Sequence, residues 1–239
     1  MPLLKLVAST ITGGVGADVL TGGTLADSIN GGGGADTLAG GAGSDVLDGG
    51  SGTNALAAYT VGALEGGLVQ VTTGTVINLS ADAITLATIN AATADFLTGS
   101  ATSVASGTQA WLFNASSNLA SADVDTIRNI TVINGSDGID YIAGSASAES
   151  ISGGAQADVI IAGNGADTIT GGAGADVITL TETTANSAAD TVVYVGASVA
   201  TDGTDTITGF AVANDIFRFI DGGAQILGTA ALGYAEGVG

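Results

Sequence analysis

A period of nine residues constrains this chain more than any other feature. From Gly13 to Ala57 the sequence advances through five nine-residue units without an insertion. A second array keeps the same register over five further units, from Gly135 to Thr179. Each unit approximates G-G-x-G-x-D-x-U-x, where U is a large aliphatic residue. Such self-similarity indicates stacked repeats, because one unit cannot bury its single aliphatic side chain alone.

The residue types within a unit predict a tight turn followed by a short strand. Glycines give the backbone the freedom for a turn with φ > 0, and x-U-x forms a three-residue strand with its central side chain pointing inward. The acidic position of the first array holds Asp18, Asp27, Asp36, Asp45 and, in the last unit, Asn54. In the second array it holds Asp140, Glu149, Asp158, Asp167 and Asp176, each followed two residues later by Ile142, Ile151, Ile160, Ile169 or Ile178.

This motif resembles the calcium-binding repeats of the repeats-in-toxin (RTX) family of secreted bacterial proteins. The resemblance covers the two arrays, 90 of 239 residues, strongly and the rest of the chain weakly. It implies that each nonapeptide is a turn plus a strand and that two nonapeptides make one coil. The expected fold is therefore all-β, a parallel β-roll (β-solenoid) of Gly-rich repeats with a non-repeat β insertion and a C-terminal β cap.

In a roll of this kind, positions 18 residues apart stack at about 4.8 Å, the inter-strand spacing. The expected rows are Asp18, Asp36 and Asn54; Asp27 and Asp45; Asp140, Asp158 and Asp176; and Glu149 and Asp167. Carboxylates this close repel one another, and a divalent cation between successive turns converts the repulsion into coordination. Carboxylates and turn carbonyls supply the six to eight oxygens that Ca²⁺ prefers, whereas Mg²⁺ retains its water. Several Ca²⁺ ions per chain are expected.

The predicted metal-site residues are the turn glycines and acids of the regular units. They are Gly14, Gly16, Asp18, Gly23, Asp27, Gly32, Gly34, Asp36, Gly41, Gly43, Asp45, Asp140, Asp158, Gly163, Gly165, Asp167, Gly172, Gly174 and Asp176. Departures from the motif weaken individual sites. Leu25 and Gln156 replace turn glycines, Asn54 lowers the ligand charge, and residues 144–152 keep a single glycine with Glu149. The alternative is a solenoid whose aspartates only cap turns, a common use of Asp.

Three segments flank or separate the arrays. Residues 1–12 are predicted to add an N-terminal strand in which Ile11 continues the inward register of Leu20. Residues 58–134 lose the period and gain β-branched alternation, which predicts an irregular β segment within one solenoid. There Trp111 and Phe113 are expected in the core. Residues 180–239 resemble the segment that closes RTX rolls. Its Asp202 and Asp205 are either ligands of a further ion or solvated loop acids, and the second interpretation is favoured.

Composition excludes several partners. The chain has 23 acidic and three basic residues, a net charge of −20, yet 46% of its residues are apolar. Nucleic acid and anionic membrane surfaces need clustered basic residues, and no segment is apolar for long enough to insert into a membrane. The first ten residues lack a clear signal-peptide pattern. The expectation is a secreted or cell-surface protein of the type I secretion class, which the resemblance implies.

Catalysis is not expected. The chain has no His and no Cys, which excludes Ser-His-Asp and Cys-His sites and zinc or copper sites of nitrogen and sulfur ligands. No G-x-S-x-G motif is present. Carboxylate pairs for glycoside hydrolysis remain formally open, but a repeat protein with 19 Asp produces such pairs by chance.

Two non-enzymatic functions compete. The first is a structural protein that self-assembles, head to tail with copies of itself, into a surface layer (S-layer), an extracellular fibre or filament, or a matrix. The second is a calcium-dependent cell-adhesion protein (adhesin) or secretion module that presents a ligand site from the middle segment. The absence of a separate effector region favours the first. A cell-surface polysaccharide is a further partner that the sequence leaves open.

Overall fold

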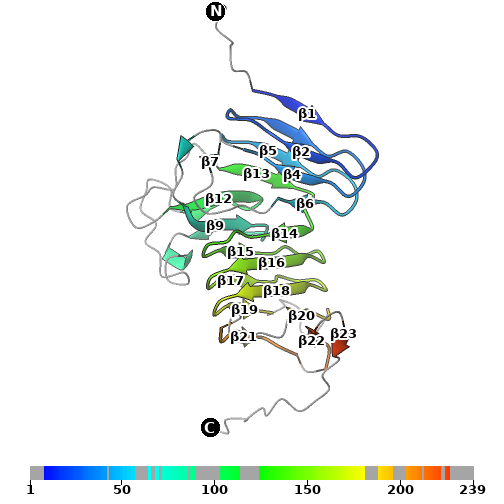
Figure 1. The fold of residues 1–239 in the computed structure, drawn as a ribbon, viewed down its shortest axis with the longest axis vertical. Coiled ribbons are helices and arrows are strands. Elements are labelled where there is room, and N and C mark those ends of the chain that lie inside the picture. The colour runs from blue at the N-terminus through cyan, green and yellow to red at the C-terminus, as the bar shows by residue number, and fades with distance from the viewer. Residues whose placement is uncertain are drawn as a thin grey trace, which may run out of the picture.

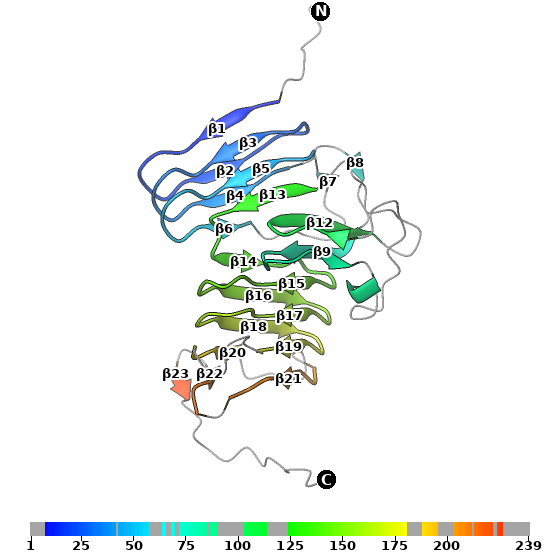
Figure 2. The same cartoon turned by 180° about the vertical axis from the view of Figure 1, so that it is seen from behind.

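The computed structural model describes residues 8–41, 43–57, 64–65, 68–69, 72–85, 87–89, 103–113, 124–180, 188–195, 203–211, 213–221 and 224–226. Short strands stack in coils along the long axis of the molecule, and the two chain ends lie at opposite ends of the stack (Figure 1; Figure 2 gives the reverse view). The expected parallel β-roll is confirmed, because almost all neighbouring strands of its two large sheets are parallel.

The roll consists of one ten-stranded and one nine-stranded sheet. In spatial order the ten-stranded sheet contains β1 (Thr10–Thr12), β3 (Ser28–Asn30), β5 (Val46–Asp48), β13 (Asp125–Arg128), β12 (Thr108–Phe113), β9 (Thr72–Asn78), β15 (Tyr141–Ala143), β17 (Val159–Ile161), β19 (Val177–Thr179) and β21 (Thr206–Thr208). The nine-stranded sheet contains β2 (Val19–Thr21), β4 (Thr37–Ala39), β6 (Ala55–Leu56), β14 (Val132–Asn134), β16 (Ser150–Ala155), β18 (Thr168–Ala173), β20 (Thr191–Val195), β22 (Ile216–Asp221) and β23 (Ala224–Ile226). Two small hairpin sheets pair β7 (Leu64–Glu65) with β8 (Leu68–Val69) and β10 (Ile84–Thr85) with β11 (Ser103–Val104).

Strand pairing within the arrays follows the 18-residue register. Ile11 pairs with Ile29 in the ten-stranded sheet, and Leu20 pairs with Leu38 in the nine-stranded sheet. Successive nonapeptides thus alternate between the two sheets, and two of them complete one coil. The central residue of each three-residue strand points inward because successive side chains of a strand alternate between faces.

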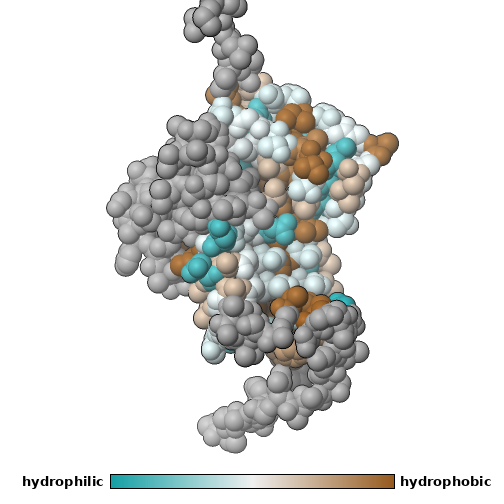
Figure 3. All heavy atoms as spheres, in the orientation of Figure 1, coloured by the Kyte–Doolittle hydropathy of each residue, from teal (hydrophilic) through white to brown (hydrophobic). Residues whose placement is uncertain are grey.

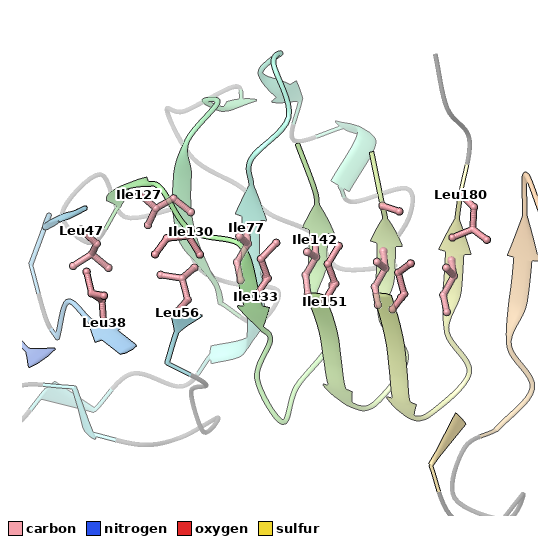
Figure 4. Close-up of a cluster of buried hydrophobic side chains, with 14 of the residues drawn as sticks. Leu38, Leu47, Leu56, Ile77, Ile127, Ile130, Ile133, Ile142, Ile151 and Leu180 are labelled. Carbon is pink, nitrogen blue, oxygen red and sulfur yellow. The ribbon is translucent and has the colours of Figure 1, made fainter. Parts of the chain in front are cut away.

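The core is the double column of these central side chains. Figure 4 shows Leu38, Leu47 and Leu56 continuing into the isoleucines of the second array. Leu38, Leu47, Leu56, Ile133, Ile142, Ile160, Ile169 and Ile178 are each 0% exposed. At the N-terminal end Ile11 and Leu20 are partly buried and pack against this column. The predicted inward register of Ile11 is confirmed.

The middle segment widens one sheet without widening the other. Strands β13, β12 and β9 lie between β5 and β15 in the ten-stranded sheet, whereas β14 alone separates β6 from β16 in the opposite sheet. Two extra strands add about 10 Å to one side. The coils of the first array are accordingly inclined to those of the second (Figure 1). Residues 72–78 and 108–113 therefore form part of the roll, while the side chains of Trp111 and Phe113 lie outside the described residues.

The C-terminal segment first prolongs the roll. Strands β20 and β22 pair in parallel with the nine-stranded sheet, and β21 does so with the ten-stranded sheet. Only β23 runs antiparallel, so it ends the nine-stranded sheet beside β22. The rings of Phe210 and Phe217 stack with their centroids 4.3 Å apart at this end. In the described part of the chain, no helix has the length and hydropathy needed to cross a membrane.

Candidate metal centre

One row of acidic residues follows the ten-stranded sheet. Each acid of the repeats directly precedes a strand, and where an acid stands one coil earlier its backbone N–H donates to Oδ1 of the following acid. The donor and acceptor pairs are Asp27 with Asp45, Asp45 with Asp125, Asp140 with Asp158, Asp158 with Asp176, and Asp176 with Asp205, at 2.7–2.9 Å. The carboxylates are thereby held at successive coils along one side of the roll.

A second row follows the nine-stranded sheet in the same way. Its pairs are Asp18 with Asp36, Asp36 with Asn54, Glu149 with Asp167, Asp167 with Asp190, and Asp190 with Asp215, at 2.7–3.0 Å. The stacking expected from the 18-residue spacing is therefore present within both arrays. Burial is nearly complete inside the arrays: Asp36, Asp45, Asp158 and Asp167 are each 1% exposed.

The second carboxylate oxygen of these acids faces the first glycine of its own turn. The Oδ2 atoms of Asp36 and Asp158 are buried and accept no hydrogen bond. A Cβ atom on Gly31 would clash with Asp36 Oδ2 and with the carbonyl oxygen of Gly49, one coil later. Likewise, a Cβ on Gly153 would clash with Asp158 Oδ2 and the Gly171 carbonyl oxygen. Glycine thus leaves room where a carboxylate oxygen and a carbonyl oxygen of the next coil converge.

This donor set fits calcium. It consists of oxygen atoms only, and a buried anionic oxygen without a partner is costly unless a cation neutralises it. Within the described residues no three acidic side chains gather into one cluster. A site between coils must therefore combine acids with backbone carbonyls, a mixture that calcium accepts readily.

The electrostatics of the rows oppose folding without a cation. Burial, and then the charges of Asp140 and Asp176, raise the pKa of Asp158 to about 9. Burial also raises the pKa of Asp140 and of Glu149, although hydrogen bonds from neighbouring residues act in the opposite direction. Asp158 must therefore either take up a proton or meet a cation when the roll forms at neutral pH.

The predicted turn glycines divide into two kinds. Gly32, Gly34, Gly41, Gly43, Gly163, Gly165, Gly172 and Gly174 have φ between +93° and +137°. A Cβ at Gly32, for example, would also clash with the Gly14 carbonyl oxygen of the preceding coil. In contrast Gly14, Gly16 and Gly23 do not have positive φ. The N–H groups of Gly14 and Gly23 instead donate to Oδ2 of Asp18 and Asp27.

The motif departures have different outcomes. Gln156 adopts φ +71°, the left-handed conformation that glycine takes in the regular turns, so the turn persists without glycine. Leu25 has no positive φ, and its backbone instead approaches Gly43 of the next coil. Asn54 keeps the row intact, because its Oδ1 accepts from the Asp36 N–H and its Nδ2 donates to the Asn129 carbonyl.

The rows contain four acids that the sequence motif did not assign. Asp125, Asp190, Asp205 and Asp215 each accept a hydrogen bond from the preceding acid of a row. The interpretation of Asp205 as a solvated loop acid is therefore wrong, because its Oδ1 is bound by the Asp176 N–H; Asp202 lies outside the described residues. The signal was present locally, since every one of them stands two residues before an inward Ile, Val or Phe. The motif did not find these acids because they are not 18 residues from the preceding acid of the row.

Comparison with known families gives one match. The RTX calcium-binding nonapeptide repeat matches in four copies, at residues 8–27, 21–56, 130–160 and 144–178. These four copies cover most of the two arrays and leave residues 1–7, 57–129 and 179–239 unmatched. No curated protein sequence matches the chain.

The stacked parallel sheets, the aligned acids and the matched repeats together define the class of the fold: a β-roll that contains calcium-binding-type nonapeptide repeats. More particularly, its repeats are those of the RTX kind, which are typical of extracellular proteins exported by type I secretion.

Proposed function

We propose that the chain is a secreted, non-enzymatic structural protein that folds on binding calcium and then assembles with copies of itself. The observation that carries calcium-dependent folding is the pair of buried acidic rows. Asp36 and Asp158 each hold an unpartnered Oδ2 beside a carbonyl of the next coil. Because a cation that binds only the folded state adds its binding free energy to folding, millimolar calcium outside the cell favours the roll. In a low-calcium cytoplasm the arrays that need calcium stay unfolded, which favours export.

The residues proposed to hold calcium are the predicted acids with the carbonyls of their turns, apart from Asp140, whose oxygens accept hydrogen bonds from Thr75 and Ser136. In the first array these are Asp18, Asp27, Asp36 and Asp45, and in the second Asp158, Asp167 and Asp176. Asp125, Asp190 and Asp205 join them because they continue the same rows. Calcium would neutralise the carboxylates, and glycines such as Gly31 and Gly153 leave the space beside Oδ2 free of a Cβ atom.

Assembly is supported by the two ends of the ten-stranded sheet. Strand β1 ends the sheet on one side and β21 ends it on the other. Both strands read Thr-Ile-Thr, and both are preceded by a residue of the acidic position, Ser9 or Asp205. Addition of β1 from one copy to β21 of another would continue the parallel sheet in its own register, as strand addition to an exposed edge does. Such a contact is heterologous and produces filaments unless it closes.

The hydrogen-bonding groups of these edges are complementary. In β1 the Ser9 carbonyl and the Gly13 N–H bond to β3, so alternation along the strand turns the N–H groups of Thr10 and Thr12 outward. In β21 the Thr206 N–H and the Thr208 carbonyl bond towards β19, which turns the Asp205 carbonyl and the backbone of Ile207 outward. Exposed apolar residues accompany the N-terminal end, where Val15 and Val19 are 99% and 81% exposed. Figure 3 shows separate apolar patches over the first coils and the last.

The proposal that the protein is not an enzyme is supported by the surface. A shallow pocket of about 200 Å³ lies beside β18 and β20. Its lining consists of Thr170, Gly172, Ala173, Val193, Tyr194 and Val195, without a carboxylate or a basic side chain.

The test has two arms on the full chain. Circular dichroism with added calcium, and with magnesium as control, reports folding, and negative-stain electron microscopy reports assembly. We expect calcium to induce β structure and filaments. Thr10→Pro removes an outward N–H at the first residue of an edge strand, where proline is tolerated, and Thr10→Val retains it. Thr10→Pro should therefore abolish filaments but not folding. Calcium-induced folding to a persistent monomer would favour an adhesin or secretion module, and no response to calcium would overturn the metal proposal.

A further inference from the structure

The acidic rows are interrupted where the middle segment enters the roll. Strand β9 pairs with β15 so that Ile77 lies beside Ile142, which places Thr75 at the position that an acid holds in the other coils. In the opposite sheet Ile133 pairs with Ile151, which places Thr131 at the acidic position before β14. The two strands that adjoin the second array, β9 and β14, therefore carry neutral threonines at the acidic positions. They introduce no carboxylate repulsion of their own.

The next coil satisfies its acids with hydroxyl groups. Ser136 stands where the regular turn has its second glycine, and its N–H donates to Asp140 Oδ2 at 2.6 Å. The Ser136 hydroxyl lies 2.9 Å from Asp140 Oδ1, and the Thr75 hydroxyl lies 2.8 Å from the same atom. Both carboxylate oxygens of the fully buried Asp140 thus accept hydrogen bonds from the protein itself.

The opposite turn of this coil repeats the arrangement. Ser145 also replaces the second glycine, and its N–H donates to Glu149 Oε2 while its hydroxyl bonds to Oε1. The longer Glu side chain reaches a hydroxyl in a turn that carries no glycine after Gly144. Hydrogen bonds to a charged carboxylate are about twice as strong as neutral ones, so these donors offset much of the cost of burial.

A second hydrophobic cluster reinforces the same region. Val76, Ile89 and Val104 of the middle segment pack on the outer face of β15 and β17, against Tyr141, Ala143 and Val159. All six are at most 7% exposed. Strands β9 and β12 add six paired residues, twice the length of a repeat strand pair. The amide of Asn78 further ties this layer by donating to the carbonyls of Asp82 and Val104.

We propose that this junction, defined as β9, β14, β15 and β16 with the turns Ser136–Asp140 and Ser145–Glu149, folds without calcium and divides the roll into two calcium-dependent arms. In it, hydroxyl donors take the place that calcium has in the other coils. The inference rests on the proposed calcium-dependent folding of the arms. It makes the junction a preformed template onto which the first array adds from one side and the rest of the second array from the other.

Hydrogen exchange of the full chain, followed by mass spectrometry in chelator and in millimolar calcium, tests the inference. In chelator we expect amides of residues 72–78 and 132–151 to exchange at least about tenfold more slowly than those of residues 13–57. In calcium both regions should be protected. If all regions exchange together in chelator and become protected in calcium, the junction proposal fails while calcium-dependent folding stands. Protection everywhere in chelator would overturn both.

Removal of the hydroxyls supplies the matched variant. Ser136→Ala with Ser145→Ala should lose junction protection in chelator and recover it in calcium, because neither serine has positive φ and alanine fits the turn. Ser147→Ala is the control, since Ser147 is exposed in the same turn and its hydroxyl bonds neither acid in the described residues. Unchanged protection of the double variant in chelator would overturn the role of the hydroxyls. So would a loss of protection in calcium as well, which would indicate a general structural role.

Discussion

Replacement of Asp158 by Asn should change stability in opposite directions with and without calcium. In the metal-free roll Asp158 lies between Asp140 and Asp176, and its pKa is raised to about 9 by burial and by these two charges. At pH 7 the carboxyl group is therefore protonated in the folded state but ionised in the unfolded state, where its pKa is 3.8. Proton uptake across roughly three pH units costs at most about 4 kcal/mol, at about 1.4 kcal/mol per unit.

Asn removes this cost and keeps the row. Its Oδ1 can accept the Asp140 N–H that Asp158 accepts at 2.8 Å, and Asn54 already occupies the equivalent position of the first array. The metal-free variant should therefore be more stable than the wild type by up to about 4 kcal/mol. With calcium it should be less stable, because a site held at 100 times its dissociation constant contributes about 2.7 kcal/mol that the variant forfeits.

The assay is circular dichroism at pH 7, read as the folded fraction in chelator and as urea unfolding in millimolar calcium. Asp82→Asn is the control, because it removes one exposed charge outside the rows and should leave both stabilities within about 0.5 kcal/mol. The reasoning is refuted if Asp158→Asn lowers stability equally in chelator and in calcium. That result would mean that the carboxylate stabilises the turn as such, independently of a cation.

Three further predictions follow from the same geometry. Acidification from pH 7 to pH 4 should stabilise the roll in chelator, because the raised pKa values of Asp140, Glu149 and Asp158 favour the protonated folded state. For Asp158 this stability is lost as the pH rises from about 4 towards about 9, and β structure in chelator that declines on acidification would contradict the prediction. Gly153→Ala should weaken calcium binding, measured by calorimetry, because its methyl group occupies the space beside Asp158 Oδ2; an unchanged affinity would contradict a site there. Ile160→Ala should destabilise the calcium-loaded roll by about 2–5 kcal/mol in urea unfolding, since Ile160 is fully buried; a loss below about 1 kcal/mol would argue against the continuous core.

The arrays could be predicted from the sequence because the residues of each unit determine its turn and its strand locally. Glycines mark the turn, one aliphatic residue marks the strand, and the constant period fixes the register of Leu20 over Leu38 without any knowledge of distant contacts. The same logic placed the acids of the arrays in rows. This reasoning depends on the nine-residue period, so it applies no further than Ala57 in the first array and Thr179 in the second.

Beyond the arrays, position in the rows is decided by tertiary pairing. Asp125 follows Asp45 in the row although 80 residues separate them, and no count of nine connects the two. Thr75 occupies an acidic position only because β9 pairs with β15, and its sequence neighbours read as an ordinary alternating strand. The hydroxyl donors Ser136 and Ser145 look like weakened copies of a metal turn until their contacts with Asp140 and Glu149 are seen.

The place of the insertion follows from the chemistry of the rows. Two additional strands in one sheet separate Asp125 from Asp140 by about 10 Å more than the repeat spacing, too far for one cation to contact both carboxylates. An interruption of this kind would leave the first acid of the following array without its calcium partner. The chain meets that requirement with Thr75 and Ser136, which supply hydroxyl donors to Asp140, and with Thr131, which introduces no charge. On the proposed calcium-dependent folding, the inserted strands are accommodated at this place because side chains of the chain itself replace the metal there.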